Sequence, residues 1–339
     1  MSAEGLTVAV TGPTGDIGRA LIPQLEQAPE VARILGMARR PFDPAEHGWT
    51  KTEYRQGDVL DRDAVDAFVA GADVVVHLAF IIFGSREETR SINLRGSRAV
   101  FEATVAAGAR RLVYTSSVAA YGFEPGRPHT LTEDMPPAVT NGFYYSAQKA
   151  ELEGLLQEIV GPSETDAYVF RPCIVAGPEA RMMIDVIPYV SIAEKLPGVV
   201  QRLFDSVPIL KPVIPDPGVP FQLVHHDDVA SALAAAVVGR GSPGIYNLAA
   251  DDTLTMREVA AELGWRRIPV PDVAVAAAAQ VVSHVPQLPN GMAWVHALRV
   301  PSVMRTERAR EELAWEPRFD ARETLRQTVR CARANGVIA

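Results

Sequence analysis

The segment Thr11-Gly12-Pro13-Thr14-Gly15-Asp16-Ile17-Gly18 joins an apolar, strand-like run at residues 6–10 to a helical pattern at residues 16–27. Gly12 permits a tight turn, and Gly15 lets the backbone come close to a pyrophosphate at the positive N-terminus of a helix. Gly18 permits close packing of that helix on the strand. Because the three glycines fall at a strand-to-helix junction, the segment predicts a dinucleotide-binding turn in preference to a glycine turn without a ligand.

Strand-like and helical patterns alternate around this segment through the first half of the chain. The apolar runs are residues 6–10, 32–38, 72–79 and 111–116, and the helical patterns are residues 16–27, 61–70 and 88–107. Strands that are apolar on both faces and separated by helices are typical of parallel sheets. We therefore predict an α/β fold with a doubly wound parallel Rossmann sheet and a smaller, mostly helical C-terminal substrate lobe.

The pattern changes after Gly177, where we place the boundary between the two lobes. Residues 1–177 form the predicted NAD(P)-binding domain, and strand-like runs within residues 221–250 are expected to return to it. Residues 178–220 are rich in proline and apolar side chains, and residues 251–339 are mostly helical in pattern. These two ranges are expected to form the substrate-binding lobe.

Composition limits the class of protein. The chain has 339 residues, of which 47% are hydrophobic and 22% charged, as in globular proteins. The formal net charge of -8 argues against a nucleic-acid partner. The two cysteines lie far apart, which excludes a Cys-rich zinc site and fits a reducing compartment. With no signal-peptide pattern and no apolar stretch of roughly 20 residues, we expect a cytoplasmic protein with no membrane partner.

The predicted second strand ends in Ala38-Arg39-Arg40. An acidic residue usually occupies the position of Ala38 in NAD-specific sites, where it binds the ribose 2′-hydroxyl. Two guanidinium groups can instead hold a 2′-phosphate. We therefore expect NADP(H) as the preferred cofactor, with NAD(H) possible. The alternative is that Arg39 and Arg40 are ordinary surface charges.

The segment Tyr145-Ser146-Ala147-Gln148-Lys149 carries the clearest catalytic pattern. The chain has only four lysines and eight tyrosines, and this pair is separated by four residues. On a helix, positions i and i+4 share a face, so Tyr145 and Lys149 point to the same side. Tyr144 lies off this face and is the weaker candidate for a general acid.

These segments and several later ones resemble the extended subclass of the short-chain dehydrogenase/reductase superfamily, from about residue 8 to residue 329. The matching residues are Gly12, Gly15 and Gly18 in TGxxGxxG, Asp58, His77-Leu78-Ala79, Asn93, Ser117 within residues 115–122, Tyr145 with Lys149, and the segments 171–178, 224–230 and 313–317. Ala176 stands where the family has Tyr in its RPxxVYGP segment.

The resemblance implies a catalytic role for Ser117, Tyr145, Lys149 and Asn93. Tyr145 would exchange a proton with the substrate oxygen, and Ser117 would position that oxygen. Neutral-pH work needs the pKa of a tyrosine to fall by roughly 3 units, and a cation about 4 Å away, Lys149, is expected to lower it. Expected cofactor contacts are Thr11, Gly12, Thr14, Gly15, Asp16, Ile17, Gly18, Arg39, Arg40, Asp58, Val59, Leu78, Ala79, Tyr145, Lys149, Pro172 and Ile174.

The resemblance also implies a homodimer. Extended members commonly pair through two helices, which here begin near Glu88 and at Tyr144. The second helix has the mixed face that such pairing requires, formed by Tyr145, Lys149, Leu152, Leu155, Leu156 and Ile159.

Three functions remain open. The first is an NADP-dependent oxidoreductase acting on a carbonyl or secondary alcohol of an apolar small molecule. The second is an NAD-dependent nucleotide-sugar epimerase. A sugar dehydratase is disfavoured because Val118 and Ala119 stand where those enzymes carry Asp-Glu. Arg181 and Arg202 lie in a lobe whose apolar composition, from residue 182 to 214, suits an apolar substrate better than a sugar diphosphate. The third function, a nucleotide-binding sensor without turnover, does not explain the Ser-Tyr-Lys group.

No metal site is expected. His225-His226-Asp227-Asp228 resembles a ligand cluster, but neighbouring residues on a strand point to opposite faces. On a continuous strand, the four side chains could not converge on one ion.

Overall fold

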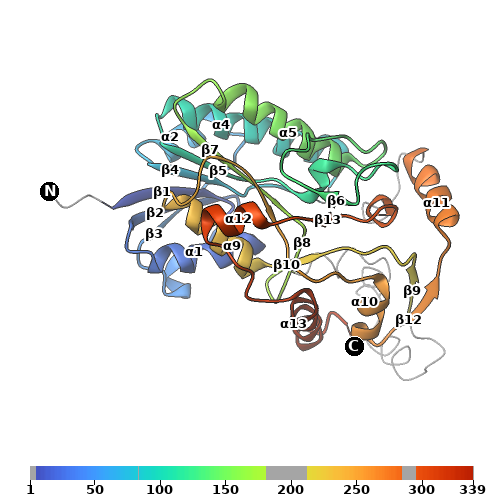
Figure 1. The fold of residues 1–339 in the computed structure, drawn as a ribbon. Helices are drawn as coiled ribbons and strands as arrows, with labels where there is room; N and C mark the ends of the chain where they lie inside the picture. The colour runs from blue at the N-terminus through green and yellow to red at the C-terminus, as the bar shows by residue number, and fades with distance from the viewer. Residues whose placement is uncertain (1–4, 83, 181–211, 285–294, 339) are drawn as a thin grey trace.

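A seven-stranded parallel sheet forms the centre of the molecule (Figure 1). The structure is a computed structural model that describes residues 5–82, 84–180, 212–284 and 295–338. The strands lie in the order β11 (Gly244–Leu248), β7 (Asp166–Pro172), β5 (Arg111–Thr115), β4 (Val74–His77), β1 (Leu6–Thr11), β2 (Val31–Ala38) and β3 (Thr52–Gln56). Every neighbouring pair is parallel. The predicted doubly wound parallel sheet is confirmed.

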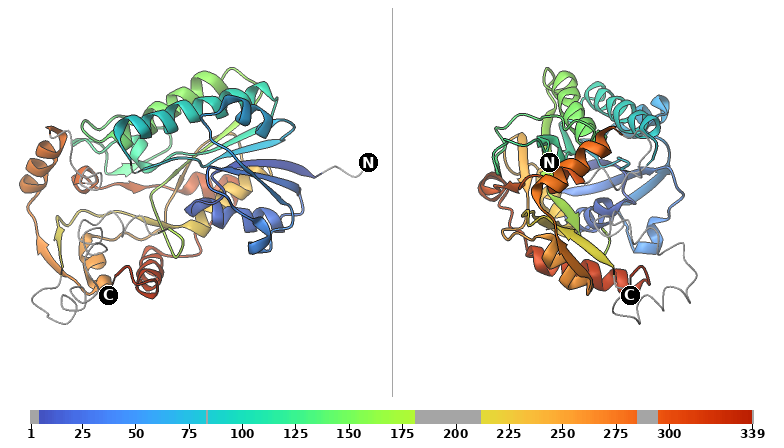
Figure 2. Two further views of the ribbon diagram at one scale, coloured as in Figure 1. Left: turned by 180° about the vertical axis from the view of Figure 1, so that it is seen from behind. Right: turned by 90° about the vertical axis from the view of Figure 1, so that its right-hand side faces the viewer.

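Helices cover both faces of the sheet, as the two views in Figure 2 show. One layer contains α2 (Arg62–Val69), α4 (Ser97–Ala106) and α5 (Tyr144–Val160), and the other contains α1 (Asp16–Gln27) and α9 (His226–Val237). Neighbouring strand residues face opposite layers, so Val8 belongs to one core and Ala9 to the other. This double burial explains why the central strands read as continuous apolar runs.

The helix expected at residues 88–107 begins slightly earlier and changes winding in the middle. It consists of α3 (Arg86–Arg90), a π-helical stretch (Ser91–Gly96) and α4. Such wider turns recur at functional sites, and Asn93 lies inside this one.

One expected strand does not return to the main sheet. β11 lies at its edge, but β10 (Leu223–His225) pairs with β8 (Ile174–Ala176) in a separate two-stranded sheet. The outer side of β7 is already hydrogen-bonded to β11 as far as Pro172. The chain after Pro172 therefore leaves the main sheet and pairs with β10 instead.

The C-terminal part is mostly helical and lies mainly below and beyond one end of the sheet (Figure 1). Its elements are α10 (Met256–Leu263), α11 (Asp272–His284), α12 (Glu307–Leu313) and α13 (Ala321–Ala334), with the short parallel pairs β9 (Val213–Asp216) with β12 (Arg266–Pro269) and β6 (Thr130–Leu131) with β13 (Val303–Met304). α10 and α13 share a small core that includes Leu263 and Leu325. α12 instead packs against β11 and α9, with Leu313 buried in the core of the sheet domain.

The side chains expected to give α5 a dimer-forming face point inward. Leu152, Leu155 and Leu156 are buried in the core between α5 and the sheet. The outward surface beside α4 instead carries charged residues, among them Arg98 and Glu158. The homodimer stays a prediction, and these leucines do not support it.

Some of the sequence predictions fall on residues outside the described ranges. They are Arg181, Arg202 and residues 182–211 of the apolar stretch. Among the helices that the structure describes, none has the length and apolar character needed to cross a membrane.

Candidate active site

The glycine turn leaves space for a ligand beside the first helix. The backbone of Gly12 has a φ of +74°, which favours glycine, and its amide donates to the Met37 carbonyl at 2.9 Å. A Cβ on Gly18 would lie 2.4 Å from the Gly12 carbonyl oxygen, so this position cannot carry a side chain without a shift. Gly15 is the N-cap of α1, makes no side-chain cap, and lines the adjoining cavity. These features fit a pyrophosphate at the N-terminus of α1.

Thr11 and His77 join the ends of β1 and β4 behind this turn. The Thr11 hydroxyl lies 2.7 Å from Nδ1 of His77, and Nε2 of His77 lies 2.8 Å from the Ser97 hydroxyl. Burial lowers the pKa of His77 to about 3, with a smaller contribution from the charge of Lys149. His77 is therefore neutral near pH 7, and its two hydrogen bonds connect Thr11 on β1 to Ser97 at the start of α4.

The two arginines after β2 have their backbone fixed by β3. The Tyr54 hydroxyl lies within hydrogen-bonding distance of both the Ala38 and Arg40 carbonyls, and the Gln56 side-chain amide donates to the Arg39 carbonyl at 2.9 Å. Within the residues that the structure describes, neither Arg39 nor Arg40 forms an ion pair, and both side chains are exposed. Arg40 lines the cavity beside the glycine turn.

A cavity of about 900 Å³ connects the glycine turn to the predicted catalytic residues. The expected residues that line it are Gly12, Thr14, Gly15, Asp16, Ile17, Gly18, Arg40, Leu78, Ser117, Tyr145, Lys149, Pro172 and Ile174. The expected contacts outside its described lining are Thr11, Arg39, Asp58, Val59 and Ala79. The cavity lies at the carboxyl ends of β1 and β4, where the order of the sheet reverses and such folds bind ligands.

Ser117 and Tyr145 meet in the wall of this cavity. Ser117 follows β5 and its hydroxyl accepts from the Ala119 amide at 3.1 Å, while Tyr145 lies in the first turn of α5. Burial raises the pKa of Tyr145 to about 12, although a hydrogen bond with the Ser117 side chain works in the opposite direction. The expected lowering of this pKa is therefore wrong for the structure as it stands, because desolvation of the phenolate outweighs the stabilising contact.

Lys149 lies one helical turn beyond Tyr145 and is buried. Its ammonium group donates to the Thr115 carbonyl at 2.9 Å. Burial lowers the pKa of Lys149 to about 7, although the charge of Glu153 opposes this change. The amine thus titrates near neutrality, and its charge depends on the groups packed around it.

Asn93 lies beneath the site and holds the loop after β4. Its Oδ1 accepts from the Ile81 amide at 2.9 Å, and its Nδ2 donates to the Ile81 carbonyl and to Oε1 of Gln148, both at 2.8 Å. Asn93 is fully buried and is not part of the described cavity lining. The geometry gives it a positioning role between this loop and α5.

Several cavity residues were missed from the sequence. Phe80 and Ile82 lie just after the predicted strand segment at His77, and Cys331 and Asn335 come from the C-terminal end of α13 and the residue that follows it. The position of Phe80 next to His77-Leu78-Ala79 was an available signal. No local pattern could have placed α13 beside the glycine turn, because the contact joins opposite ends of the chain.

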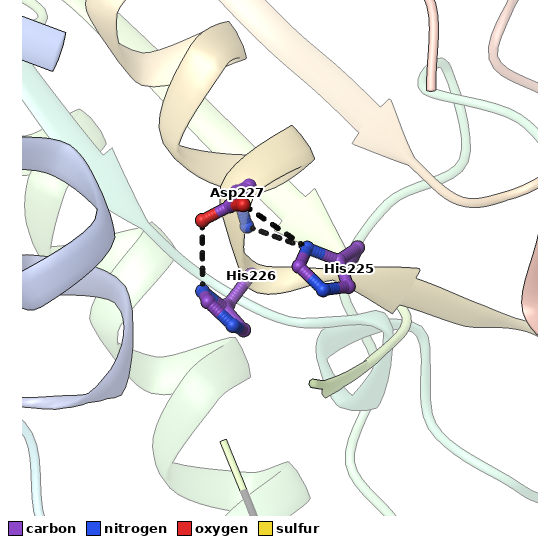
Figure 3. A group of neighbouring side chains, drawn as sticks. All are labelled: His225, His226 and Asp227. Carbon is purple, nitrogen blue, oxygen red and sulfur yellow. Dashed lines mark hydrogen bonds and ion pairs between the residues drawn. The ribbon is translucent and has the colours of Figure 1, made fainter. Parts of the chain in front are cut away.

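The cluster His225, His226 and Asp227 does converge (Figure 3). β10 ends at His225 and α9 begins at His226, so the argument from a continuous strand is wrong for these three residues, and one potential ligand atom from each lies within 4.8 Å of the others. The fourth residue, Asp228, is not part of this group, and its carboxylate accepts hydrogen bonds from Arg318 and the Phe319 amide. Nδ1 of His225 accepts the Asp227 amide at 3.2 Å and caps α9. Arg318 lies 3.8 Å from the Asp227 carboxylate. These contacts give the cluster a helix-capping role.

The sheet order, the glycine turn and the Ser117, Tyr145 and Lys149 group define an extended short-chain dehydrogenase/reductase. Residues 8–249 match the model of the NAD dependent epimerase/dehydratase family, and the chain belongs to this family. Its members include oxidoreductases, epimerases and dehydratases.

Some sequence relatives match nearly all of this chain, and others match about half of it. It is 29% identical to uncharacterized protein y4nG of Sinorhizobium fredii over 97% of this chain and 79% of the relative. It is 28% identical to ceramide reductase of Caulobacter vibrioides over 91% of this chain and 86% of the relative. Human 3 beta-hydroxysteroid dehydrogenase type 7 is 34% identical over 47% of this chain and 46% of its own. Matches to longer mycobacterial proteins, at 26% identity, span 29% of those proteins.

Solved structures share the fold. MoeE5 in complex with UDP-glucuronic acid and NAD superimposes with a TM-score of 0.69 at 20% identity, over 97% of this chain and 99% of that one. At this identity the likeness concerns the fold alone.

Proposed function

We propose that this protein is an NADP-dependent oxidoreductase that interconverts a carbonyl and a secondary alcohol on an apolar small molecule. The observation that carries the proposal is a single cavity that combines the glycine turn with Ser117, Tyr145 and Lys149. In this arrangement the glycine turn that would bind the nucleotide and the proton donor Tyr145 line the same cavity, so both can act on one substrate.

The chain's own residues account for the proton transfer. With a pKa of about 12, the Tyr145 phenol is protonated at neutral pH and has a proton to donate to a carbonyl oxygen during reduction. The Ser117 hydroxyl, hydrogen-bonded to Tyr145, would position that oxygen. A bound nicotinamide would supply or accept the hydride. The positive charge of Lys149 would stabilise the phenolate left after donation.

The preference for NADP rests on Arg39 and Arg40. Their backbone is fixed by Tyr54 and Gln56, and within the described residues their guanidinium groups have no acidic partner. Planar guanidinium groups suit a 2′-phosphate, which would neutralise this local positive charge.

The apolar substrate class rests on the cavity wall near Tyr145. Phe80, Ile82, Val118 and Val175 line the described cavity. Its two arginines in the described ranges, Arg19 and Arg40, come from α1 and from the segment that follows β2, on the nucleotide side. The names of two relatives, a ceramide reductase and a hydroxysteroid dehydrogenase, agree with an apolar substrate for this chain.

The alternative is an NAD-dependent nucleotide-sugar epimerase, a reaction found in the same family. Mass spectrometry of the small molecules released by heat denaturation separates the two proposals. NADP, or a protein that binds NADPH more tightly than NADH in titration, would support the oxidoreductase. Retained NAD together with a nucleotide sugar would overturn it. A screen of long-chain and steroid ketones with NADPH would then test the substrate class.

A further inference from the structure

Phe80 touches both members of the Tyr145 and Lys149 pair. The Lys149 ammonium nitrogen lies 3.8 Å from the centroid of the Phe80 ring. The same ring meets the ring of Tyr145 edge-on, with centroids 5.7 Å apart and an interplanar angle of 84°. Phe80 also lines the cavity, so it lies at the boundary between the catalytic pair and the substrate space.

The loop that carries Phe80 is held in place by hydrogen bonds from Asn93 and Tyr144. Asn93 makes two hydrogen bonds to the backbone of Ile81, the next residue, and a third to Gln148 on α5. Tyr144, also on α5, donates to the Ile82 carbonyl at 2.6 Å. The position of the ring relative to α5 is thus fixed by contacts on both sides of the pair.

The other groups that face Lys149 give it limited support as a cation. The Thr115 carbonyl accepts one hydrogen bond, and the Tyr114 ring lies farther away, with its centroid at 5.3 Å. Glu153 carries the opposite charge, but its two oxygens bind Arg171 at 3.0 and 2.6 Å. His77 on β4 is neutral near pH 7 because burial and the charge of Lys149 lower its pKa.

We infer that Phe80 is a positioning residue that holds the Lys149 ammonium group against its ring face and keeps it charged beside Tyr145. The electron-rich face of an aromatic ring attracts a desolvated cation by about 0.5 to 2 kcal/mol. The neutral amine gains no comparable attraction. The inference rests on the proposed function only for the catalytic meaning of this charge, since the contact can be measured without a substrate.

The test is NMR titration of the protein labelled with [13Cε]-lysine. The chain has four lysines, so the spectrum is simple, and loss of one signal in Lys149→Met assigns the resonance. We expect the Lys149 signal of the wild type to titrate near neutral pH. In Phe80→Leu its midpoint should fall by about 0.4 to 1.5 pH units, which is the cation–π energy converted at 1.36 kcal/mol per unit.

Two variants distinguish an effect of the aromatic ring face on the Lys149 midpoint from a general effect of side-chain packing. Phe80→Tyr keeps an aromatic face and should restore a midpoint close to the wild-type value. Phe143→Leu removes a different aromatic ring, whose centroid lies 5.9 Å from that of the Tyr145 ring, and should leave the Lys149 midpoint unchanged. Circular dichroism of each variant checks that it folds.

An unchanged Lys149 midpoint in Phe80→Leu would overturn the inference, as would an equal shift in Phe143→Leu. The outcome is independent of turnover. A shift in Phe80→Leu in a protein that reduces no ketone would support the role of Phe80 and count against the proposed function alone.

Discussion

Glu153 and Arg171 form a buried ion pair in which both carboxylate oxygens bind the guanidinium group, at 3.0 and 2.6 Å. Their side chains are 5% and 0% exposed. Ser116 donates a hydrogen bond to the same carboxylate, and Arg171 stacks on the Tyr121 ring at 4.3 Å. The pair therefore ties α5 and β7 to the segment that places Ser117 against Tyr145.

Breaking this pair should unfold the protein more readily. Glu153→Gln leaves a buried guanidinium group without its counter-charge, and we expect the free energy of unfolding to fall by about 3 to 5 kcal/mol. Urea denaturation measures the change. Glu151→Gln is the matched control on the same helix, because the Arg90–Glu151 pair is exposed and should contribute less than about 1 kcal/mol. An equal loss of unfolding free energy in the two variants would contradict the expectation that the buried pair contributes more than the exposed pair.

Tyr145→Phe should abolish ketone reduction and leave NADPH affinity nearly unchanged, because the hydroxyl serves the proton transfer. Steady-state kinetics and fluorescence titration measure the two properties. Tyr144→Phe is the control on the neighbouring residue: its hydroxyl donates to the Ile82 carbonyl and not to a substrate, so the variant should retain more turnover than Tyr145→Phe. Substantial activity in Tyr145→Phe would exclude this residue as the acid.

Arg39→Ala and Arg40→Ala should each weaken NADPH binding more than NADH binding. Loss of a guanidinium contact to the 2′-phosphate should raise the NADPH Kd by roughly tenfold or more, as for a charged hydrogen bond of about 1.5 to 3 kcal/mol. Arg40→Ala is expected to have the larger effect, since Arg40 lines the cavity. Arg33→Ala, within β2 and paired with Glu53, should change neither affinity. Equal weakening of both cofactors would show that these arginines do not recognise the phosphate.

The buried Lys149 should make stability depend on pH. Its folded-state pKa of about 7 lies below the ordinary value of 10.5, so between these values the unfolded chain binds more protons at this site. The cost of burying the charge is fully present below pH 7 and is relieved as the pH rises. The stability of the wild type relative to Lys149→Met should thus rise by up to about 1.4 kcal/mol per pH unit within this window.

Urea denaturation from pH 6 to pH 9 measures this difference. Lys51→Met is the control, since Lys51 is partly exposed and also donates to a backbone carbonyl, that of Ala28, at 2.8 Å. A flat difference between wild type and Lys149→Met across the range would contradict a neutral-range pKa for Lys149.

The sequence predicted those features that depend on local order. The glycine turn joins β1 to α1, and β1, β2, β4 and β5 all coincide with apolar runs. β3 went unrecognised because it reads Thr-Glu-Tyr-Arg-Gln and is buried mainly at Thr52. It is an edge strand that pairs only with β2 in the described sheet, so its side chains carry little apolar pattern.

Features that depend on tertiary environment could not be predicted. The i, i+4 spacing placed Tyr145 and Lys149 on one helix face, but the pKa of each group follows from burial, which spacing does not reveal. The junction of β10 and α9 at His225 reversed the expected geometry of the histidine cluster, because a single-residue change of backbone direction redirects the side chains. The contacts of Phe80 with Tyr145 and Lys149 could not be predicted either, because they form only when the fold brings the loop after β4 next to α5.

The cavity wall that includes Cys331 and Asn335 has a consequence for synthesis of the protein. A nascent chain that has emerged through α5 already contains the glycine turn, Ser117, Tyr145 and Lys149. It lacks the wall supplied by the end of α13, which is made more than 150 residues later. The ribosome must therefore translate the chain as far as Asn335 before this part of the cavity wall is in place.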